Sequence, residues 1–166
     1  MKLQGYCYKF PDNINTDSII SGRYKFAVTN MKELAKHVME DIDPGFYKRL
    51  KPGKSIIVAG ENFGMGSSRE QAPLAIKHAG IIAVVAKSFA RIFYRNSFNI
   101  GLPLVETDTD SIKEQDSLEI NLEQGLIKNL TRNKTLDINP LPRIMMSLLS
   151  DEGVVAHVKK YGGLNL

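Results

Sequence analysis

Two short runs of consecutive apolar residues dominate the hydrophobic pattern of the chain. One lies within residues 54–59, where it follows Lys54 and Ser55, the other spans residues 81–86, and both are rich in Val and Ile. Continuous β-branched runs of this length are typical of strands buried on both faces of a parallel sheet. A segment ending near Ala79 and residues 88–100 instead carry apolar side chains at helical spacing. With a further strand starting at Pro103, the pattern predicts parallel βαβ units.

The flanking segments show other periodicities. Loose alternation predicts a short strand over residues 3–10, and i, i+4 spacing predicts an amphipathic helix over residues 31–40. Residues 117–138 alternate around turn residues, which indicates antiparallel strands, and residues 143–149 have a helical pattern behind two prolines. No repeat or linker interrupts the chain. We therefore expect one α/β domain over residues 1–166, with mixed parallel and antiparallel sheets.

The charge balance limits the classes of partner. The chain has 22 Lys and Arg against 18 Asp and Glu, a formal net charge of +4. The basic residues are scattered, which argues against nucleic acid and suits an anionic substrate or an acidic partner protein. No stretch approaches the roughly 18 apolar residues that a membrane span needs, and the first residues have no secretory apolar run. We therefore expect a cytoplasmic protein without membrane contact.

Metal-binding residues are scarce. Cys7 is the single cysteine, and there are three histidines. One thiol excludes an intrachain disulfide and cannot hold an iron–sulfur cluster by cysteine ligation. It also fits a reducing compartment. We expect no cofactor and no metal site in this chain.

Residues 60–70, with the sequence GENFGMGSSRE, form the segment best suited to chemistry. They join a predicted buried strand to a predicted helix, the position where open α/β sheets bind ligands. Glycines allow backbone N–H groups to approach an anion, and Arg69 could bind a carboxylate with two hydrogen bonds. Ser67 or Ser68 could instead cap the helix. Pro73 argues against capping, because a helix that began at either serine would place this proline beyond its first turn.

Other catalytic motifs do not fit this segment. A nucleophile elbow requires Gly-x-Ser-x-Gly, and a phosphate-binding Walker loop requires Gly-Lys-Ser/Thr, and neither is present. The three histidines, His37, His78 and His157, are better explained as surface or packing residues than as ligands.

Three motifs resemble those of one known family. Residues 62–70 (NFGMGSSRE), followed by residues 87–92 (KSFARI), are similar to the swivelling domain of the aconitase family. Residues 15–20 (NTDSII) with residues 22–24 (GRY) resemble the opening motif of its stand-alone form, the small subunits of 3-isopropylmalate dehydratases. The motifs occur in family order. The resemblance implies a three-layer β/β/α swivelling domain.

The resemblance also implies a function and a partner. The reaction would be a reversible dehydration and rehydration that interconverts 2-isopropylmalate and 3-isopropylmalate in leucine biosynthesis. The chain would be the small subunit of this hydro-lyase, active only with a large subunit that carries a [4Fe–4S] cluster. The two would form a heterodimer or heterotetramer acting on a small hydroxy acid. A non-catalytic module that binds anions or RNA is the alternative from another class.

Individual residues take roles from the same resemblance. Ser67 matches the catalytic base, Arg69 the arginine that binds a substrate carboxylate, and Ser68 a neighbouring substrate contact. Substrate choice is expected from the segment after residue 22, where Arg23, Phe26 and Val28 stand. The apolar residues there favour a branched aliphatic group. Lys25 and Arg23 leave open a related hydro-lyase acting on homoaconitate, 2,3-dimethylmalate or citramalate-type acids.

Overall fold

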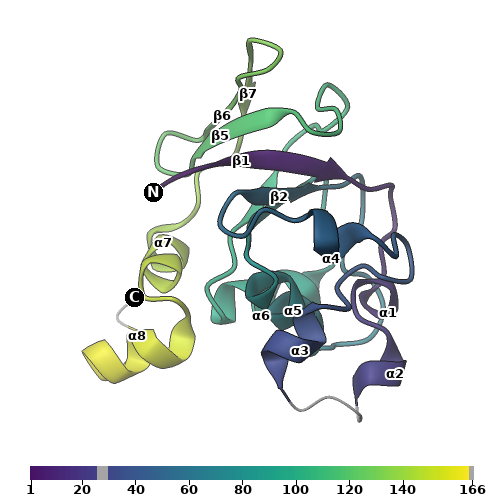
Figure 1. Cartoon of the computed structure of the whole chain (residues 1–166). Helices are drawn as coiled ribbons and strands as arrows, with labels where there is room; N and C mark the ends of the chain where they lie inside the picture. Colours follow the sequence, from purple (N-terminus) through teal and green to yellow (C-terminus); the bar gives the residue numbers. More distant parts are fainter. Residues whose placement is uncertain (26–29, 165–166) are drawn as a thin grey trace.

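Strand β1 (Lys2–Lys9) lies at the centre of the sheet. In this computed structural model, which describes residues 1–25 and 30–164, β1 pairs in parallel with β2 on one side and antiparallel with β5 on the other. The described strands form one sheet in the order β4-β3-β2-β1-β5-β6-β7 (Figure 1). The other strands are β2 (Ser55–Val58), β3 (Ile81–Ala86), β4 (Leu104–Glu106), β5 (Ser117–Asn121), β6 (Leu126–Asn129) and β7 (Lys134–Asp137). The predicted α/β chain with mixed parallel and antiparallel pairing is confirmed.

The predicted helices lie in two connections between neighbouring parallel strands. Helix α5 (Gln71–His78) joins β2 to β3, and α6 (Arg91–Asn99) joins β3 to β4. Both lie on the side of the parallel strands away from the antiparallel strands (Figure 1). The remaining helices are α1 (Thr16–Ile19), α2 (Gly22–Lys25), α3 (Met31–Ala35), α4 (Phe46–Arg49), α7 (Arg143–Ser150) and α8 (Val154–Tyr161).

The predicted helix over residues 31–40 is too long. Asn30 caps α3, its side chain accepting a hydrogen bond from the Lys32 N–H, but the helix ends at Ala35. Met39 adopts a left-handed φ of 57° and donates its N–H to the Ile19 carbonyl at 2.8 Å. This tertiary bond replaces the helical one, while Met39 itself is buried as the apolar spacing predicts.

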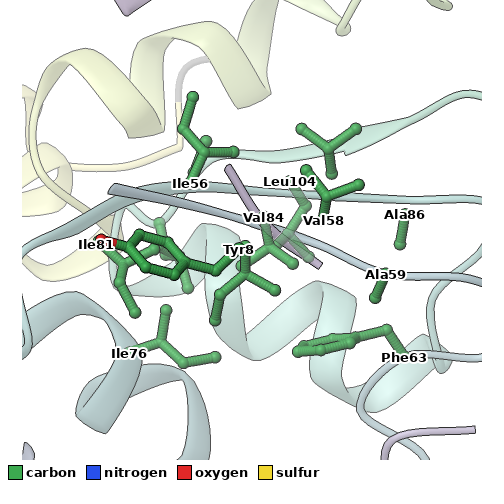
Figure 2. Close-up of a cluster of buried hydrophobic side chains, with 14 of the residues drawn as sticks. Tyr8, Ile56, Val58, Ala59, Phe63, Ile76, Ile81, Val84, Ala86 and Leu104 are labelled. Atoms are coloured by element: carbon green, nitrogen blue, oxygen red, sulfur yellow. The ribbon is translucent and has the colours of Figure 1, made fainter. Parts of the chain in front are cut away.

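The core lies between the parallel strands and their helices. All four residues of β2 are buried, as are five of the six residues of β3. Figure 2 shows their side chains, among them Ile56, Val58 and Val84, with Ile76 of α5 and Phe63 of the following loop. Full burial of an aliphatic side chain of this size stabilises the fold by about 1.5–3 kcal/mol. The strand ends that carry the site are therefore rigidly supported.

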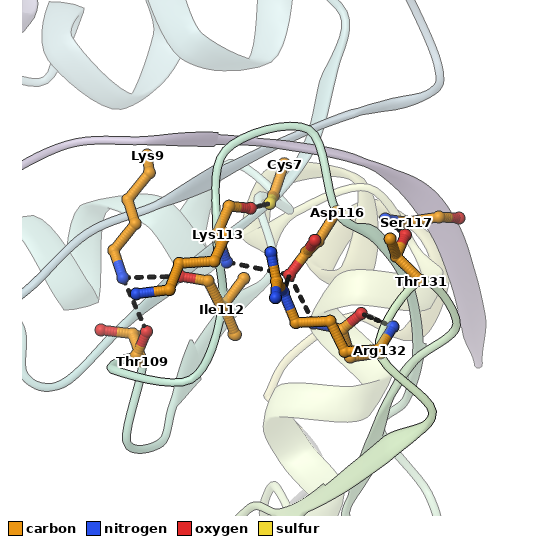
Figure 3. Close-up of polar contacts among 10 residues, drawn as sticks. Cys7, Lys9, Thr109, Ile112, Lys113, Asp116, Ser117, Thr131 and Arg132 are labelled. Carbon is orange, nitrogen blue, oxygen red and sulfur yellow. Dashed lines mark hydrogen bonds and ion pairs between the residues drawn. The ribbon is translucent and has the colours of Figure 1, made fainter.

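The connection between β4 and β5 is fastened to β1 by polar contacts (Figure 3). The Lys9 ammonium donates to the carbonyls of Thr109 at 2.9 Å and Ile112 at 2.6 Å. The Thr109 hydroxyl in turn donates to the Ala59 carbonyl at 2.9 Å. Since Ala59 precedes the glycine-rich loop, this connection supports the base of that loop.

Asp116 is the buried centre of the same connection. Its carboxylate accepts hydrogen bonds from the Asn129 amide at 2.7 Å, the Lys113 N–H at 2.9 Å and Arg132 Nε at 2.7 Å. Burial acts to raise the pKa of Asp116, but these hydrogen bonds and the Arg132 charge outweigh it, so the pKa lies below its ordinary value. The charged carboxylate thus holds β5 and β6 in register beside β1.

Candidate functional site

The glycine-rich loop, residues 60–70, ends at the position that Pro73 predicts for the start of the next helix. Helix α5 begins at Gln71, so Pro73 is its third residue and loses no intrahelical hydrogen bond. The N-cap residue is Glu70, and no side chain makes a capping hydrogen bond there. Ser67 and Ser68 are exposed in the loop upstream of the helix. The capping alternative for these serines is therefore not what the structure shows.

Backbone hydrogen bonds join the segment around the motif NTDSII (residues 15–20) to the segment around the motif NFGMGSSRE (residues 62–70). The N–H of Asn13 donates to the Glu61 carbonyl at 2.8 Å, and the N–H of Gly64 donates to the Ile14 carbonyl at 2.7 Å. The N–H of Thr16 donates to the Met65 carbonyl at 2.8 Å. Segments about 50 residues apart in the sequence thus form a single structural unit.

The motif KSFARI (residues 87–92) is joined to the same unit through Phe63. The Phe63 N–H donates to the Ser88 carbonyl at 3.0 Å, and the Ala90 N–H donates to the Phe63 carbonyl at 2.9 Å. The Ser88 hydroxyl accepts the Asn62 N–H at 2.8 Å. All three motifs that carry the family resemblance therefore converge at one end of the parallel strands.

Gly64 is required by close packing in this unit. Its φ is 80°, and a Cβ atom there would lie 2.2 Å from Cγ of Phe93. A side chain would therefore be both strained and in collision. The glycine lets the loop pass directly over α6, which places the following serines at the edge of the sheet.

Ser67 and Arg69 contact each other directly. The Arg69 Nε donates to the Ser67 hydroxyl at 3.0 Å, while the Ser67 carbonyl accepts the Arg69 N–H at 2.7 Å. The Thr16 hydroxyl donates to the same carbonyl at 3.0 Å. The serine thus has a fixed backbone, an exposed hydroxyl and an adjacent positive charge.

Asp17 and Gly22 enclose the far end of the Arg69 guanidinium. Nη1 of Arg69 is enclosed and lies 2.5 Å from Oδ1 of Asp17, in an ion pair without the alignment of a hydrogen bond. A Cβ atom at Gly22 would lie 3.5 Å from Nη1 and 3.6 Å from Nη2. Nη2 has no hydrogen-bond partner among residues 1–25 and 30–164. This atom is available to an incoming carboxylate.

The residues expected to set substrate choice are only partly described. Arg23 is exposed, forms an ion pair with Asp41 and donates from Nε to the Ser21 hydroxyl at 3.2 Å. The structure thus engages Arg23 with other side chains and does not bring it to Ser67. Phe26 and Val28, like the side chain of Lys25, lie outside the described residues. Their contact with substrate stays a prediction.

Cys7 does not have the character of a metal ligand. It is buried, its Sγ donates to the Lys113 carbonyl at 2.8 Å, and burial raises its pKa to about 12. Metals bind the thiolate, which this environment disfavours. Over residues 1–25 and 30–164 there is also no group of three or more His, Cys, Asp or Glu side chains placed to hold a metal ion. In the same part of the chain, no helix has the length and apolar character to cross a membrane.

Comparison with known proteins gives a consistent result. The family model of the aconitase C-terminal domain matches residues 8–109. A "3-isopropylmalate dehydratase small subunit 2" of Archaeoglobus fulgidus is 54% identical over 166 residues, which is 100% of both chains. A "3-isopropylmalate dehydratase small subunit" of Wolinella succinogenes is 55% identical over 94% of this chain and 93% of the relative. The crystal structure of a 3-isopropylmalate dehydratase from Methanocaldococcus jannaschii superimposes with a TM-score of 0.93 at 47% identity, covering 98% and 96% of the two chains.

The matched segment contains the three converging motifs, and the fold agrees over nearly the whole chain. The chain therefore belongs to the aconitase C-terminal domain family. Within that class it belongs with the small subunits of 3-isopropylmalate dehydratases, which are aconitase-family hydro-lyases. The family expected from the sequence motifs is confirmed.

Sequence reasoning did not assign a role to Thr16 or Asp17. Both belong to the motif NTDSII. The Thr16 hydroxyl donates to the Ser67 carbonyl, and Asp17 forms an ion pair with Arg69. One signal was present: Asn15 caps the short helix α1, accepting the Ser18 N–H at 2.7 Å, so the next two residues start a rigid turn. The direction of that turn depends on tertiary hydrogen bonds that no local pattern reveals.

Proposed function

We propose that this chain is the small subunit of a hydro-lyase that interconverts 2-isopropylmalate and 3-isopropylmalate by dehydration and rehydration in leucine biosynthesis. The observation that carries the proposal is the exposed Ser67 hydroxyl, held 3.0 Å from Arg69 Nε where the three family motifs meet. The names of the full-length relatives support the same substrate.

Ser67 acts as the base in this proposal. Dehydration removes a proton from the carbon next to a carboxylate, while the hydroxyl group leaves the neighbouring carbon with its bonding electrons and takes up a proton to become water. The C–H electrons become the second bond of the alkene, and the proton passes to the Ser67 oxygen. A serine accepts a proton only as an alkoxide, so a positive charge must lie beside it. Arg69 Nε occupies that position.

Arg69 has a second task, which is to hold a substrate carboxylate. Its Nε is engaged by Ser67 and its Nη1 by Asp17, whereas Nη2 has no partner within the described part of the chain and can donate to a carboxylate. Asp17 keeps the guanidinium plane in place before substrate arrives and can yield Nη1 to a carboxylate, which would then be bound by two parallel hydrogen bonds. Ser68, exposed beside this pair, is a further substrate contact.

The proposal requires a large subunit. Cys7 is the single cysteine and is a buried thiol, so the residues of this chain do not fit an iron–sulfur cluster. We assign the [4Fe–4S] cluster to the large subunit, in a heterodimer or heterotetramer, and we assign no step of the reaction to a group on this chain other than those named above. The complex would work in the cytoplasm, where reducing conditions preserve thiol ligands.

The isopropyl substituent would face the segment that contains Phe26 and Val28. An apolar segment favours the branched aliphatic group by about 0.8 kcal/mol for each buried CH₂. A third carboxylate would be desolvated there without a partner, at a cost of at least about 2 kcal/mol. This difference favours isopropylmalate over homoaconitate.

The test combines the purified chain with its cluster-bearing large subunit under anaerobic, reducing conditions. Formation of the unsaturated product is followed by ultraviolet absorbance for 2-isopropylmalate, homocitrate and citramalate. We expect turnover of 2-isopropylmalate by the mixture and none by either chain alone. Turnover by the small subunit alone, or a preference for homocitrate in kcat/KM, would contradict the proposal.

A further inference from the structure

Basic and apolar side chains are exposed together on the outer face of α6. Arg91 and Arg95 are exposed, and Ile92 between them is 50% exposed although α6 buries Phe93 on its other face. Arg91 and Arg95, with Phe89, Tyr94 and Glu106, line one hollow at the surface. We call Phe89, Arg91, Ile92, Tyr94 and Arg95 the α6 patch. It combines a half-exposed aliphatic side chain, two aromatic rings and two guanidinium groups.

The patch carries two positive charges, against the single carboxylate, Glu106, that lines the same hollow. Arg91 and Arg95 are four residues apart on one helix, so their like charges repel each other. Over the described ranges 1–25 and 30–164, neither has a carboxylate within ion-pair distance. Arg91 is also the first residue of α6, where a positive charge opposes the helix dipole. The arrangement lowers the stability of the isolated helix and would be relieved by an acidic surface placed against it.

The α6 patch is continuous with the base of the serine loop. Phe63 of that loop lies edge-on to Phe89, with ring centroids 6.1 Å apart, and shares backbone hydrogen bonds with Ser88 and Ala90. The patch and Ser67 therefore lie at the same end of the parallel strands. Any subunit that brings substrate to Ser67 must cover this end of the molecule.

We propose that the α6 patch is a docking surface for the large subunit and that it receives an acidic segment with an apolar side chain. Aromatic residues and arginine are the residue types enriched at protein interfaces, and Ile92 adds an exposed apolar side chain on the same helix beside the two charges. The inference rests on the proposed function, because that function requires the partner. A single-stranded RNA would need exposed aromatic rings on which its bases could stack, but Phe89 and Tyr94 are half-buried, and the half-exposed Ile92 beside the arginines favours a protein.

The experiment measures the dissociation constant of the two subunits by titration calorimetry. The test variant is Arg91→Glu/Arg95→Glu, and the control is Lys48→Glu/Lys159→Glu, which makes the same change in net charge at exposed positions elsewhere. Glutamate at position 91, in the first turn of α6, is favourable, and position 95 is exposed, so the test variant should fold, and thermal unfolding verifies this. Ile92→Ala, which leaves the charges unchanged, tests the apolar part of the α6 patch.

We expect Arg91→Glu/Arg95→Glu to weaken association at least tenfold and the control less than twofold. Raising the salt concentration should narrow the difference, and saturating partner should restore the wild-type kcat. An unchanged dissociation constant in the double variant and in Ile92→Ala overturns the inference. So does loss of binding to poly(U) RNA in the double variant while subunit association is unaltered. If the wild-type pair associates but does not turn over 2-isopropylmalate, the proposed function fails, and the docking surface is still tested by the dissociation constants.

Discussion

Replacing Arg69 by lysine separates the two tasks assigned to this residue. If Arg69 only bound a substrate carboxylate, Arg69→Lys would raise KM and leave kcat unchanged. The structure adds the Nε hydrogen bond to the Ser67 hydroxyl, 3.0 Å long, and the contact of Nη1 with Asp17 at 2.5 Å. A lysine has one nitrogen and cannot occupy both positions. We therefore expect kcat to fall as well as KM to rise.

The magnitude follows from the contact that is lost. A hydrogen bond to a charged group contributes about 1.5–3 kcal/mol, and the Arg69 side chain is 20% exposed next to an exposed serine. Solvent screening favours the lower part of that range, about 1.5–2 kcal/mol. Since about 1.4 kcal/mol is a tenfold change in rate, we expect kcat to fall roughly 10- to 30-fold. The charged form of Ser67 would be stabilised less, so the acidic limb of the kcat profile should move to higher pH.

The assay is steady-state turnover of 2-isopropylmalate by the reconstituted complex, with kcat and KM measured across pH. Arg143→Lys, at an exposed position on α7, is the matched control and should leave kcat and KM unchanged. Asp17→Asn keeps an oxygen near Nη1 and should lower kcat less than Arg69→Lys does. A rise in KM alone for Arg69→Lys, with an unshifted pH profile, would show that Nε does not act on the base.

Three further predictions concern substrate choice and folding. Phe26→Arg should raise kcat/KM for homocitrate relative to 2-isopropylmalate, because the arginine supplies a partner for a third carboxylate. Phe26→Leu should leave this ratio unchanged. An unchanged ratio for Phe26→Arg would show that residue 26 does not contact the substrate. Asp116→Ala should lower the free energy of unfolding by about 3 kcal/mol in urea titrations, while exposed Asp137→Ala should have little effect. Gly64→Ala should cost about 2–5 kcal/mol through left-handed backbone strain and the collision with Phe93, whereas Gly163→Ala, with nothing within 4 Å of the new Cβ, should be neutral.

The Asp116 prediction has a pH dependence of known sign. The pKa of this carboxyl is lowered in the folded chain, so its stabilisation is complete above the ordinary value of 3.8 and is lost as the pH falls through the folded-state pKa. Wild type and Asp116→Ala should therefore differ most near neutral pH and converge in acid. A constant difference down to the acid transition would show that the charge does not contribute.

The parallel half of the fold could be predicted from the sequence because its signals are local. Residues 56–59 and 81–86 are continuous apolar runs, and a strand buried on both faces needs such a run. Pro73 likewise locates the start of α5 by a steric rule that does not depend on the rest of the fold. These predictions required no long-range information.

Other features depend on contacts between distant segments. Met39 leaves the helical path because its N–H finds the Ile19 carbonyl, and no helix propensity records that bond. Helix α8 buries only His157, so its apolar spacing was too weak to indicate it. Thr16 and Ser67 are 51 residues apart, and their contact arises from the pairing of two loops. The motifs could therefore identify Ser67 and Arg69 as candidates, but only the structure shows which atoms meet.

The proposed role of Ser67 as the base is measured most directly by kcat for Ser67→Ala in the reconstituted complex. We expect kcat to fall about 10²–10⁴-fold, with KM nearly unchanged and with the melting temperature and subunit affinity of the wild type. Ser68→Ala, at the neighbouring exposed position, should lose much less kcat. Near-normal turnover by Ser67→Ala in a fully assembled complex would contradict the assignment.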